Sequence, residues 1–192
     1  MAGAAGDRGA ADRRSSRRRA DDFSGARRTG LLRLVWRAVA RRRGDVRGAR
    51  RALHSLPIED CPFRRDLDTT MAEARSRVAG GLVDLDNLED SYAGWTGEQL
   101  LAELERTRPA SEDLVVCHGD LTLDNVLVDP RTGGLTGVID VGRLGVADRW
   151  LDLAILQREL TEEPFAAFLA GYELTGPDQD KLAFYILLDE FF

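Results

Sequence analysis

The chain has 192 residues, of which 43% are hydrophobic, so it is long enough to bury the core of one domain of ordinary size. Its formal net charge of −6 is unevenly divided, because residues 1–50 hold 15 arginines and five acids whereas residues 51–192 hold 12 basic and 28 acidic residues. A basic segment attracts nucleic acid or anionic lipid and an acidic body attracts cationic ligands, so the two parts are expected to differ in their partners.

The cysteines and the apolar segments exclude several classes of protein. Cys61 and Cys117 lie 56 positions apart without a CxxC pair, so we expect no disulfide and no zinc site. The reducing cytoplasm is then the natural compartment. The most apolar early segment, LLRLVWRAVA, contains two arginines and is too short to span a bilayer. We therefore expect a soluble or at most surface-associated protein, with no membrane partner.

Residues 1–48 form an arginine-rich segment. Residues 1–30 consist mainly of Ala, Gly, Arg, Asp and Ser, and this composition cannot bury enough apolar surface to offset the entropy of ordering. Over residues 31–43, apolar residues recur at helical spacing with arginines on the remaining face, which indicates a possible basic helix. The segment is otherwise expected to be disordered.

From about residue 50 the pattern is that of an ordinary folded protein. Apolar residues at helical spacing predict a helix within residues 66–81, ended by two glycines. Thr96 and Gln99 match a capping box that opens a helix closed by Pro109. Three more helices are predicted near the end of the chain, over about 149–160, 163–173 and 178–191.

Between these helices the pattern becomes that of short strands. The stretches LVVC (114–117), VLV (126–128) and LTGVID (135–140) are typical of strands, and DPRTGG forms a hairpin turn between the last two. This order places Asp120 and Asn125 in one loop, and the hairpin returns Asp140 beside them. The predicted class is α+β, mostly helical with a small β-hairpin at the site.

Asp120, Asn125 and Asp140 match the needs of phosphoryl transfer. This reaction requires a carboxylate that orients the attacking hydroxyl and accepts its proton, and oxygen ligands that hold Mg²⁺ against the phosphates of ATP. Asp120, in the loop, suits the first task. Asn125 and Asp140 suit the second.

These stretches resemble those of the aminoglycoside 3'-phosphotransferases. HGDLTLDN (118–125) is similar to their form of the catalytic loop of the kinase fold, and IDVGR (139–143) resembles their replacement for the kinase DFG motif. The resemblance covers roughly residues 50–192, including the ending KLAFYILLDEFF. It implies a protein-kinase-like C-terminal lobe over residues 49–192. It also implies ATP- and Mg²⁺-dependent phosphorylation of an aminoglycoside hydroxyl, an antibiotic-resistance activity.

The resemblance also implies a role for individual residues. Asp120 resembles the catalytic aspartate, Asn125 and Asp140 resemble the magnesium ligands, and His118 resembles the histidine that supports the loop. An aminoglycoside carries several ammonium groups and would be drawn to carboxylates. The residues that the resemblance implies for substrate binding are Asp189, Glu190, Phe192 through its carboxylate, Glu162, Glu163, Arg143 and Arg158.

One part of such an enzyme is not recognisable in this sequence. The N-terminal lobe of a kinase has a Gly-rich loop, a strand lysine and a helix glutamate that bind the nucleotide. The single lysine, Lys181, lies after the catalytic loop, and residues 1–50 contain no glutamate and no Gly-rich hairpin. The N-lobe is therefore predicted to be missing, the nucleotide-binding residues are unknown, and activity is expected to be weak or absent.

Several interpretations of this arrangement stay open. Residues 1–48 are either the product of a truncated or frame-shifted gene or a genuine replacement with its own function. Two other functions compete with the enzyme: a non-catalytic remnant that binds polycations, and an adaptor whose arginine-rich arm binds nucleic acid or a membrane surface. The adaptor predicts that deletion of residues 1–45 abolishes partner binding. The enzyme interpretation expects an aminoglycoside as partner and no nucleic acid.

Overall fold

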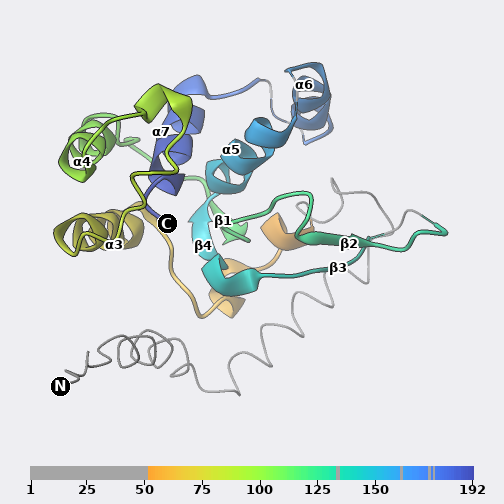
Figure 1. Cartoon of the computed structure of the whole chain (residues 1–192). Helices are drawn as coiled ribbons and strands as arrows, with labels where there is room; N and C mark the ends of the chain where they lie inside the picture. Colours follow the sequence, from red (N-terminus) through yellow and green to blue (C-terminus); the bar gives the residue numbers. More distant parts are fainter. Residues whose placement is uncertain (1–51, 133–134, 161, 173, 175) are drawn as a thin grey trace, which may run out of the picture. The chain divides into compact units, whose positions relative to one another are not determined.

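The computed structural model describes residues 52–132, 135–160, 162–172, 174 and 176–192. Within these ranges the chain is rich in helices and has two small antiparallel sheets (Figure 1). The predicted α+β class, mostly helical with a small hairpin, is confirmed for this part. The arginine-rich segment 1–48 and its possible helix over 31–43 lie outside the described residues, as do residues 133–134 of the hairpin turn.

The helices agree closely with the predicted ranges. They are α3 (Leu67–Ala79), α4 (Gly97–Arg106), α5 (Trp150–Glu159), α6 (Glu162–Gly171) and α7 (Gln179–Asp189). Short 3-10 turns are η2 (Ile58–Asp60), η3 (Asp90–Tyr92) and η4 (Val141–Arg143).

Side-chain caps fix where three of the helices begin. Asp66 accepts a hydrogen bond from the Thr69 amide at the start of α3, and Asp178 caps α7 in the same way. Thr96 and Gln99 form both halves of the predicted capping box at the start of α4. These caps satisfy amide groups that would otherwise lack a partner in the first turn.

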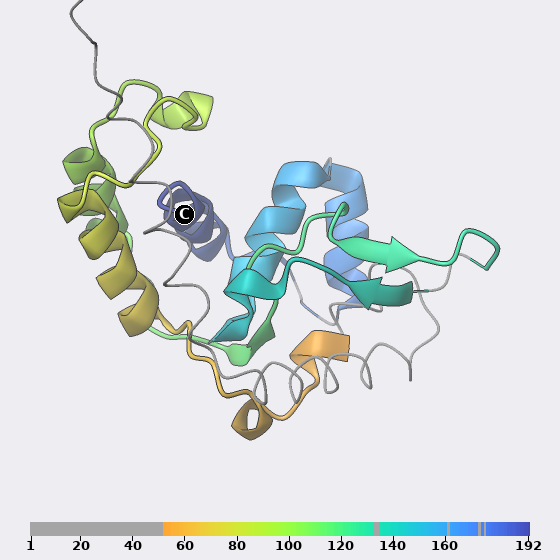
Figure 2. The ribbon, with the colours of Figure 1, turned by 60° about the horizontal axis from the view of Figure 1, so that its bottom comes forward.

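Helix α5 is buried along most of its length. Residues 150–156 are all buried, because the helix is apolar on nearly every side. Helix α7 packs against α5 and also against α4, and α4 packs against α3 (Figures 1 and 2). Asp152 is the one acidic residue in this buried stretch.

The strands form two separate pairs. Strand β1 (Leu114–Cys117) runs antiparallel to β4 (Gly145–Asp148), and β2 (Val126–Val128) runs antiparallel to β3 (Leu135–Val138). Strand β4 was not predicted, because GVAD lacks a strand-like alternation and finds its partner about 30 residues away. Strand β3 ends at Val138 rather than at the predicted residue 140. Asp140 has φ 54°, a left-handed conformation that does not continue a strand.

The β2–β3 hairpin extends away from α3 and α4, while β1 and β4 lie beside α5 (Figure 2). The loop from β1 to β2 and the turn from β3 to β4 both connect one strand pair to the other, so these two connections lie next to each other. Within the described ranges, no helix is both long and apolar enough to cross a membrane.

Candidate active site

The loop after β1 is held against the turn η4 by close backbone packing. Gly119 has φ +83°, and a Cβ atom at this position would lie 2.5 Å from the carbonyl oxygen of Arg143. Only glycine combines this left-handed backbone with so close an approach. The glycine of the HGD stretch is therefore required by local packing, independently of any chemistry.

A buried carboxylate fixes the start of this loop. Asp152 is fully buried, and its Oδ2 accepts the His118 amide at 3.0 Å while its Oδ1 accepts the Gly119 amide at 2.8 Å. A carboxylate in the interior must be hydrogen-bonded to be tolerated. Here these bonds set the direction in which the chain leaves β1.

The same carboxylate organises a buried polar network. His54 Nε2 lies 2.9 Å from Asp152 Oδ2, and His54 Nδ1 forms a hydrogen bond with the hydroxyl of Tyr172. Cys117 Sγ lies 3.9 Å from His54 Nε2 and donates to the carbonyl of Asp148. Burial raises the pKa of Cys117 well above its usual value.

His118 joins the loop to the segment that carries Asp140. The ring is fully buried, and its Nε2 donates to the carbonyl oxygen of Ile139 at 2.8 Å. The amide of Ile139 in turn donates to the carbonyl oxygen of Asn125 at 3.0 Å. The two segments that hold the candidate residues are therefore tied together by direct hydrogen bonds.

The structure brings Asp120, Asn125 and Asp140 into one region. Asn125 Nδ2 donates to the carbonyl oxygen of Asp120 at 2.8 Å, so the two residues lie side by side as the loop pattern predicts. Burial raises the pKa of Asp120; Arg143 lowers it, Asp189 raises it, and the nearby Asp140 also raises it. Asp120 is half-buried and Asp140 is exposed.

The donor set of this region fits a magnesium ion. Asn125 uses its amide nitrogen for the bond to Asp120, which leaves its side-chain oxygen for another partner. Asp140 adds an exposed carboxylate. Oxygen ligands of this kind are those that Mg²⁺ prefers.

Asp189 is held near the loop by two arginines. Its Oδ1 accepts from Arg143 at 2.6 Å, and its Oδ2 accepts from Arg158 at 2.7 Å. Arg143 Nη1 also lies 3.5 Å from the carbonyl oxygen of Gly119. Arg143 therefore links the acidic end of α7 directly to the loop that carries Asp120.

Glu190 belongs to the same group of charges. Its Oε2 accepts the amide of Glu89 at 3.1 Å, and its Oε1 lies 3.7 Å from Arg158 Nη2. Burial raises the pKa of Glu190. Glu89 also forms an ion pair with Arg158 at 2.7 Å. Sequence reasoning did not identify Glu89, which lies in an irregular segment with many acids and no distinguishing motif.

The other implied substrate residues are less closely connected. The ring of Phe192 lies against Arg143. Glu162 is exposed at the start of α6, and no hydrogen bond or ion pair in the described part of the chain joins it to Asp189 or Glu190. Glu163 lies in the same helix, but its side chain is outside the described part.

The single lysine forms an ion pair outside this region. Lys181 Nζ lies 2.6 Å from Oδ2 of Asp148, which is fully buried. Asp148 also accepts the amide of Trp150 at 3.1 Å, so the pair connects α7 to the start of α5. Lys181 therefore has a structural role and does not face the loop residues.

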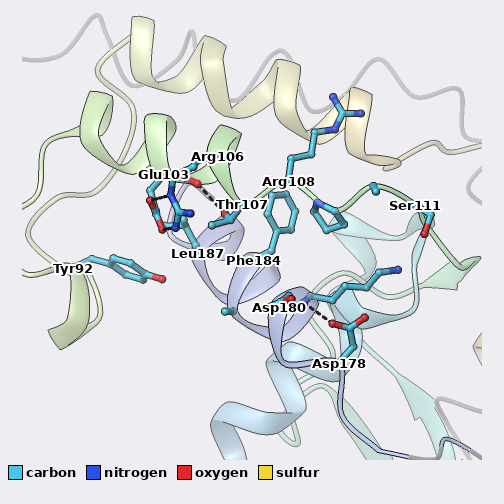
Figure 3. A pocket seen from close by; sticks show the side chains of 14 residues that line it. Tyr92, Glu103, Arg106, Thr107, Arg108, Ser111, Asp178, Asp180, Phe184 and Leu187 are labelled. Carbon is cyan, nitrogen blue, oxygen red and sulfur yellow. Dashed lines mark hydrogen bonds and ion pairs between the residues drawn. The ribbon is translucent and has the colours of Figure 1, made fainter.

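A cavity of about 690 Å³ lies elsewhere on the molecule (Figure 3). It is bordered by the end of α4, by residues 107–111 and by one face of α7 as far as Leu187, with Tyr92 at one side. None of the loop residues or the acids at the end of α7 line it. The arrangement of chemically suited groups, rather than this cavity, therefore identifies the candidate site.

Known proteins share both the sequence and the fold of this chain. The model of the phosphotransferase enzyme family matches residues 12–185, a range that begins within the arginine-rich segment. The chain is 62% identical over 150 residues to an aminoglycoside 3'-phosphotransferase of Streptomyces fradiae, and the match covers 74% of this chain and 56% of that relative.

Two solved structures show the same similarity. The crystal structure of an aminoglycoside-3'-phosphotransferase of type VIII has a TM-score of 0.71 and 53% identity, covering 83% of this chain and 61% of that one. Aminoglycoside phosphotransferase APH(3'')-Id from Streptomyces rimosus, in complex with ADP and streptomycin, has a TM-score of 0.65 and 33% identity, with 90% and 66% covered.

The chain thus spans less than two thirds of the length of each of these relatives. The resemblance stated from the HGD and IDVGR motifs is confirmed by the family model and by the identities. The chain belongs to the phosphotransferase enzyme family.

Proposed function

We propose that residues 52–192 are the catalytic and substrate-binding part of an ATP-dependent aminoglycoside phosphotransferase. One observation carries this proposal. Arg143 contacts Asp189 at 2.6 Å and reaches the carbonyl oxygen of Gly119, so the carboxylates at the end of α7, which would suit a polycation, lie next to the loop that carries Asp120. Polycation binding and phosphoryl transfer need this proximity between an acidic surface and a base.

Asp120 is proposed to orient the substrate hydroxyl and accept its proton. The hydrogen bond from Asn125 to the carbonyl oxygen of Asp120 holds the loop in a fixed conformation. Because burial raises the pKa of Asp120, its carboxylate is a better proton acceptor than a fully exposed aspartate. Asn125 and Asp140 are proposed to hold Mg²⁺, which when bound neutralises charge on the phosphates.

Asp189 and Glu190 are proposed to bind ammonium groups of the antibiotic. Each carboxylate oxygen can accept more than one hydrogen bond, so the arginines on Asp189 do not exhaust its capacity. The arginines instead hold the carboxylate in one orientation. Phe192, Glu162 and Glu163 remain proposed contributors through their positions near the end of α7 and the start of α6.

This chain is proposed to phosphorylate aminoglycosides weakly or not at all. A relative of this chain is known in complex with ADP, which supports the use of ATP in the family. Lys181 is the single lysine of the sequence and is paired with buried Asp148, so it does not serve a nucleotide. Residues 1–51 lie outside the described part.

Phosphoryl transfer to kanamycin tests the proposal. With ATP and Mg²⁺, we expect at most slow formation of phosphorylated kanamycin, detected by mass spectrometry. Where product forms, Asp120→Ala should form it about 100-fold more slowly, because general-base catalysis contributes on this order. Asp68→Ala is the control, since Asp68 is 88% exposed on α3.

Equal product from the wild type and Asp120→Ala would contradict the role of Asp120. Retained kanamycin binding without any turnover dependent on Asp120 would favour the non-catalytic polycation binder. Turnover as fast as that of a full-length relative would show that residues 1–51 build a nucleotide site.

A further inference from the structure

The last residue of the chain lies among three arginines that are far apart in sequence. The ring centroid of Phe192 is 5.3 Å from Cζ of Arg65, 5.7 Å from Cζ of Arg77 and 5.5 Å from Cζ of Arg143. These arginines, here called the arginine clamp, come from the segment before α3, from α3 and from η4. Cations over an aromatic ring at this distance are attracted by it.

Arg77 also binds the backbone next to this ring. Its Nε donates to the carbonyl oxygen of Phe191, and its Nη2 donates to the carbonyl oxygen of Leu82 at 2.7 Å. Phe191 is fully buried, so the carbonyl is part of a packed region. One side chain thus joins the last turn of α3, the segment that follows it and the end of the chain.

Arg143 connects the clamp to the candidate active site. The same guanidinium that faces Phe192 forms the ion pair with Asp189 and lies near the carbonyl oxygen of Gly119. Arg65 also lies against the ring, and its stem packs where a side chain at Gly145 would otherwise stand. If the ring of Phe192 moved away, Arg143 would therefore lose its cation–π contact.

The position of the Arg77 side chain is not explained by an ion pair. Among the described residues, no carboxylate forms an ion pair with it, whereas Arg65 pairs with Glu73 at 3.3 Å and Arg143 pairs with Asp189. The described hydrogen bonds of Arg77 go to backbone carbonyls, and its guanidinium also makes a cation–π contact with the ring of Phe192. Its contacts are those of a residue that holds a chain end in place.

We infer that Arg77 is a positioning residue that docks the C-terminal residues, so that Asp189 and Glu190 stay beside the catalytic loop. The docking itself depends only on the contacts above. Its effect on antibiotic affinity rests on the proposed function. Arg77 lies on α3, which contains none of the site motifs, and it touches neither Asp120 nor Asp189 in the described contacts.

Release of the C-terminal residue tests the docking without any antibiotic. We expect Arg77→Leu to lose phenylalanine to a carboxypeptidase specific for aromatic residues about tenfold faster than the wild type, because cleavage follows the population of the undocked end. Arg75→Leu is the matched control, since Arg75 lies on the same helix and is exposed in a pair with Glu105 at 2.8 Å. Equal rates for the two variants would overturn the docking.

The affinity for kanamycin tests the positioning. Arg77→Leu is expected to weaken binding about tenfold relative to Arg75→Leu, with similar urea midpoints for the two variants. Arg77→Lys keeps a cation near the ring but cannot donate to both carbonyls, so an intermediate affinity is expected, and this variant replaces Arg77→Leu if the latter does not fold.

The two readouts separate the possible failures. Faster release of phenylalanine with unchanged kanamycin affinity would overturn the positioning role. If the wild type binds no kanamycin, the proposed function fails, and the carboxypeptidase rates alone decide whether Arg77 docks the chain end.

Discussion

Gly119→Ala is expected to lower the free energy of unfolding by about 3 kcal/mol. The alanine would have to adopt φ near +83°, which costs about 1–2 kcal/mol for a residue with a Cβ atom. Its Cβ would also stand 2.5 Å from the Arg143 carbonyl oxygen and 2.8 Å from the Arg143 Cβ, and overpacking costs about 1–3 kcal/mol. Urea unfolding of the purified chain measures the change.

Gly94→Ala separates the two contributions to this loss. Gly94 has φ +80°, but a Cβ atom there would meet nothing within 4 Å. This variant should therefore lose about 1 kcal/mol through backbone strain alone. If both variants lost the same amount, the close packing of the loop on η4 would be refuted. If Gly119→Ala lost Asp120-dependent turnover and Gly94→Ala kept it, the result would show that this packing supports the candidate active site.

Asp152→Asn is expected to cost about 3 kcal/mol of stability although the two side chains have nearly the same volume. The amide can present only one oxygen, so its NH₂ group must face either the His118 amide or the Gly119 amide, both of which are donors. Hydrogen bonds to a charged group are worth about 1.5–3 kcal/mol, and a buried donor without an acceptor adds a penalty.

The partner His54 makes the loss larger. Its Nε2 lies 2.9 Å from the same carboxylate, so the variant also leaves an imidazole without its charged acceptor. Asp86→Asn, on the surface, is the control and should change stability by less than about 0.5 kcal/mol. Equal urea midpoints for the two variants would show that Asp152 does not hold the loop.

Local sequence signals predicted the helices and the loop. The capping box at Thr96 and Gln99 and the glycines after α3 act over a few residues, so a single sequence is enough to find them. The HGD stretch and Asn125 lie in one loop for the same reason. The pairing of β1 with β4 is different, because it depends on packing between segments about 30 residues apart.

The buried partners of the site were not predicted. Asp152 stands in the first turn of α5, where an acid ordinarily stabilises the start of a helix. Its position therefore did not indicate that it binds the loop after β1. The usable signal was the run of apolar residues on every side of it, since a lone acid in a buried helix needs a hydrogen-bonding partner. His54 and Glu89 offered no such pattern, because their partners come from distant parts of the chain.

A calorimetric titration of the chain with kanamycin tests the central claim most directly, namely that the acidic end of α7 binds a polycation beside the catalytic loop. We predict that the wild type binds kanamycin, that Asp189→Asn binds at least about tenfold more weakly, and that added salt weakens binding further. Asp180→Asn, at the other end of α7 and exposed, should bind like the wild type. No binding by the wild type, or equal affinities for Asp189→Asn and Asp180→Asn, would contradict the claim.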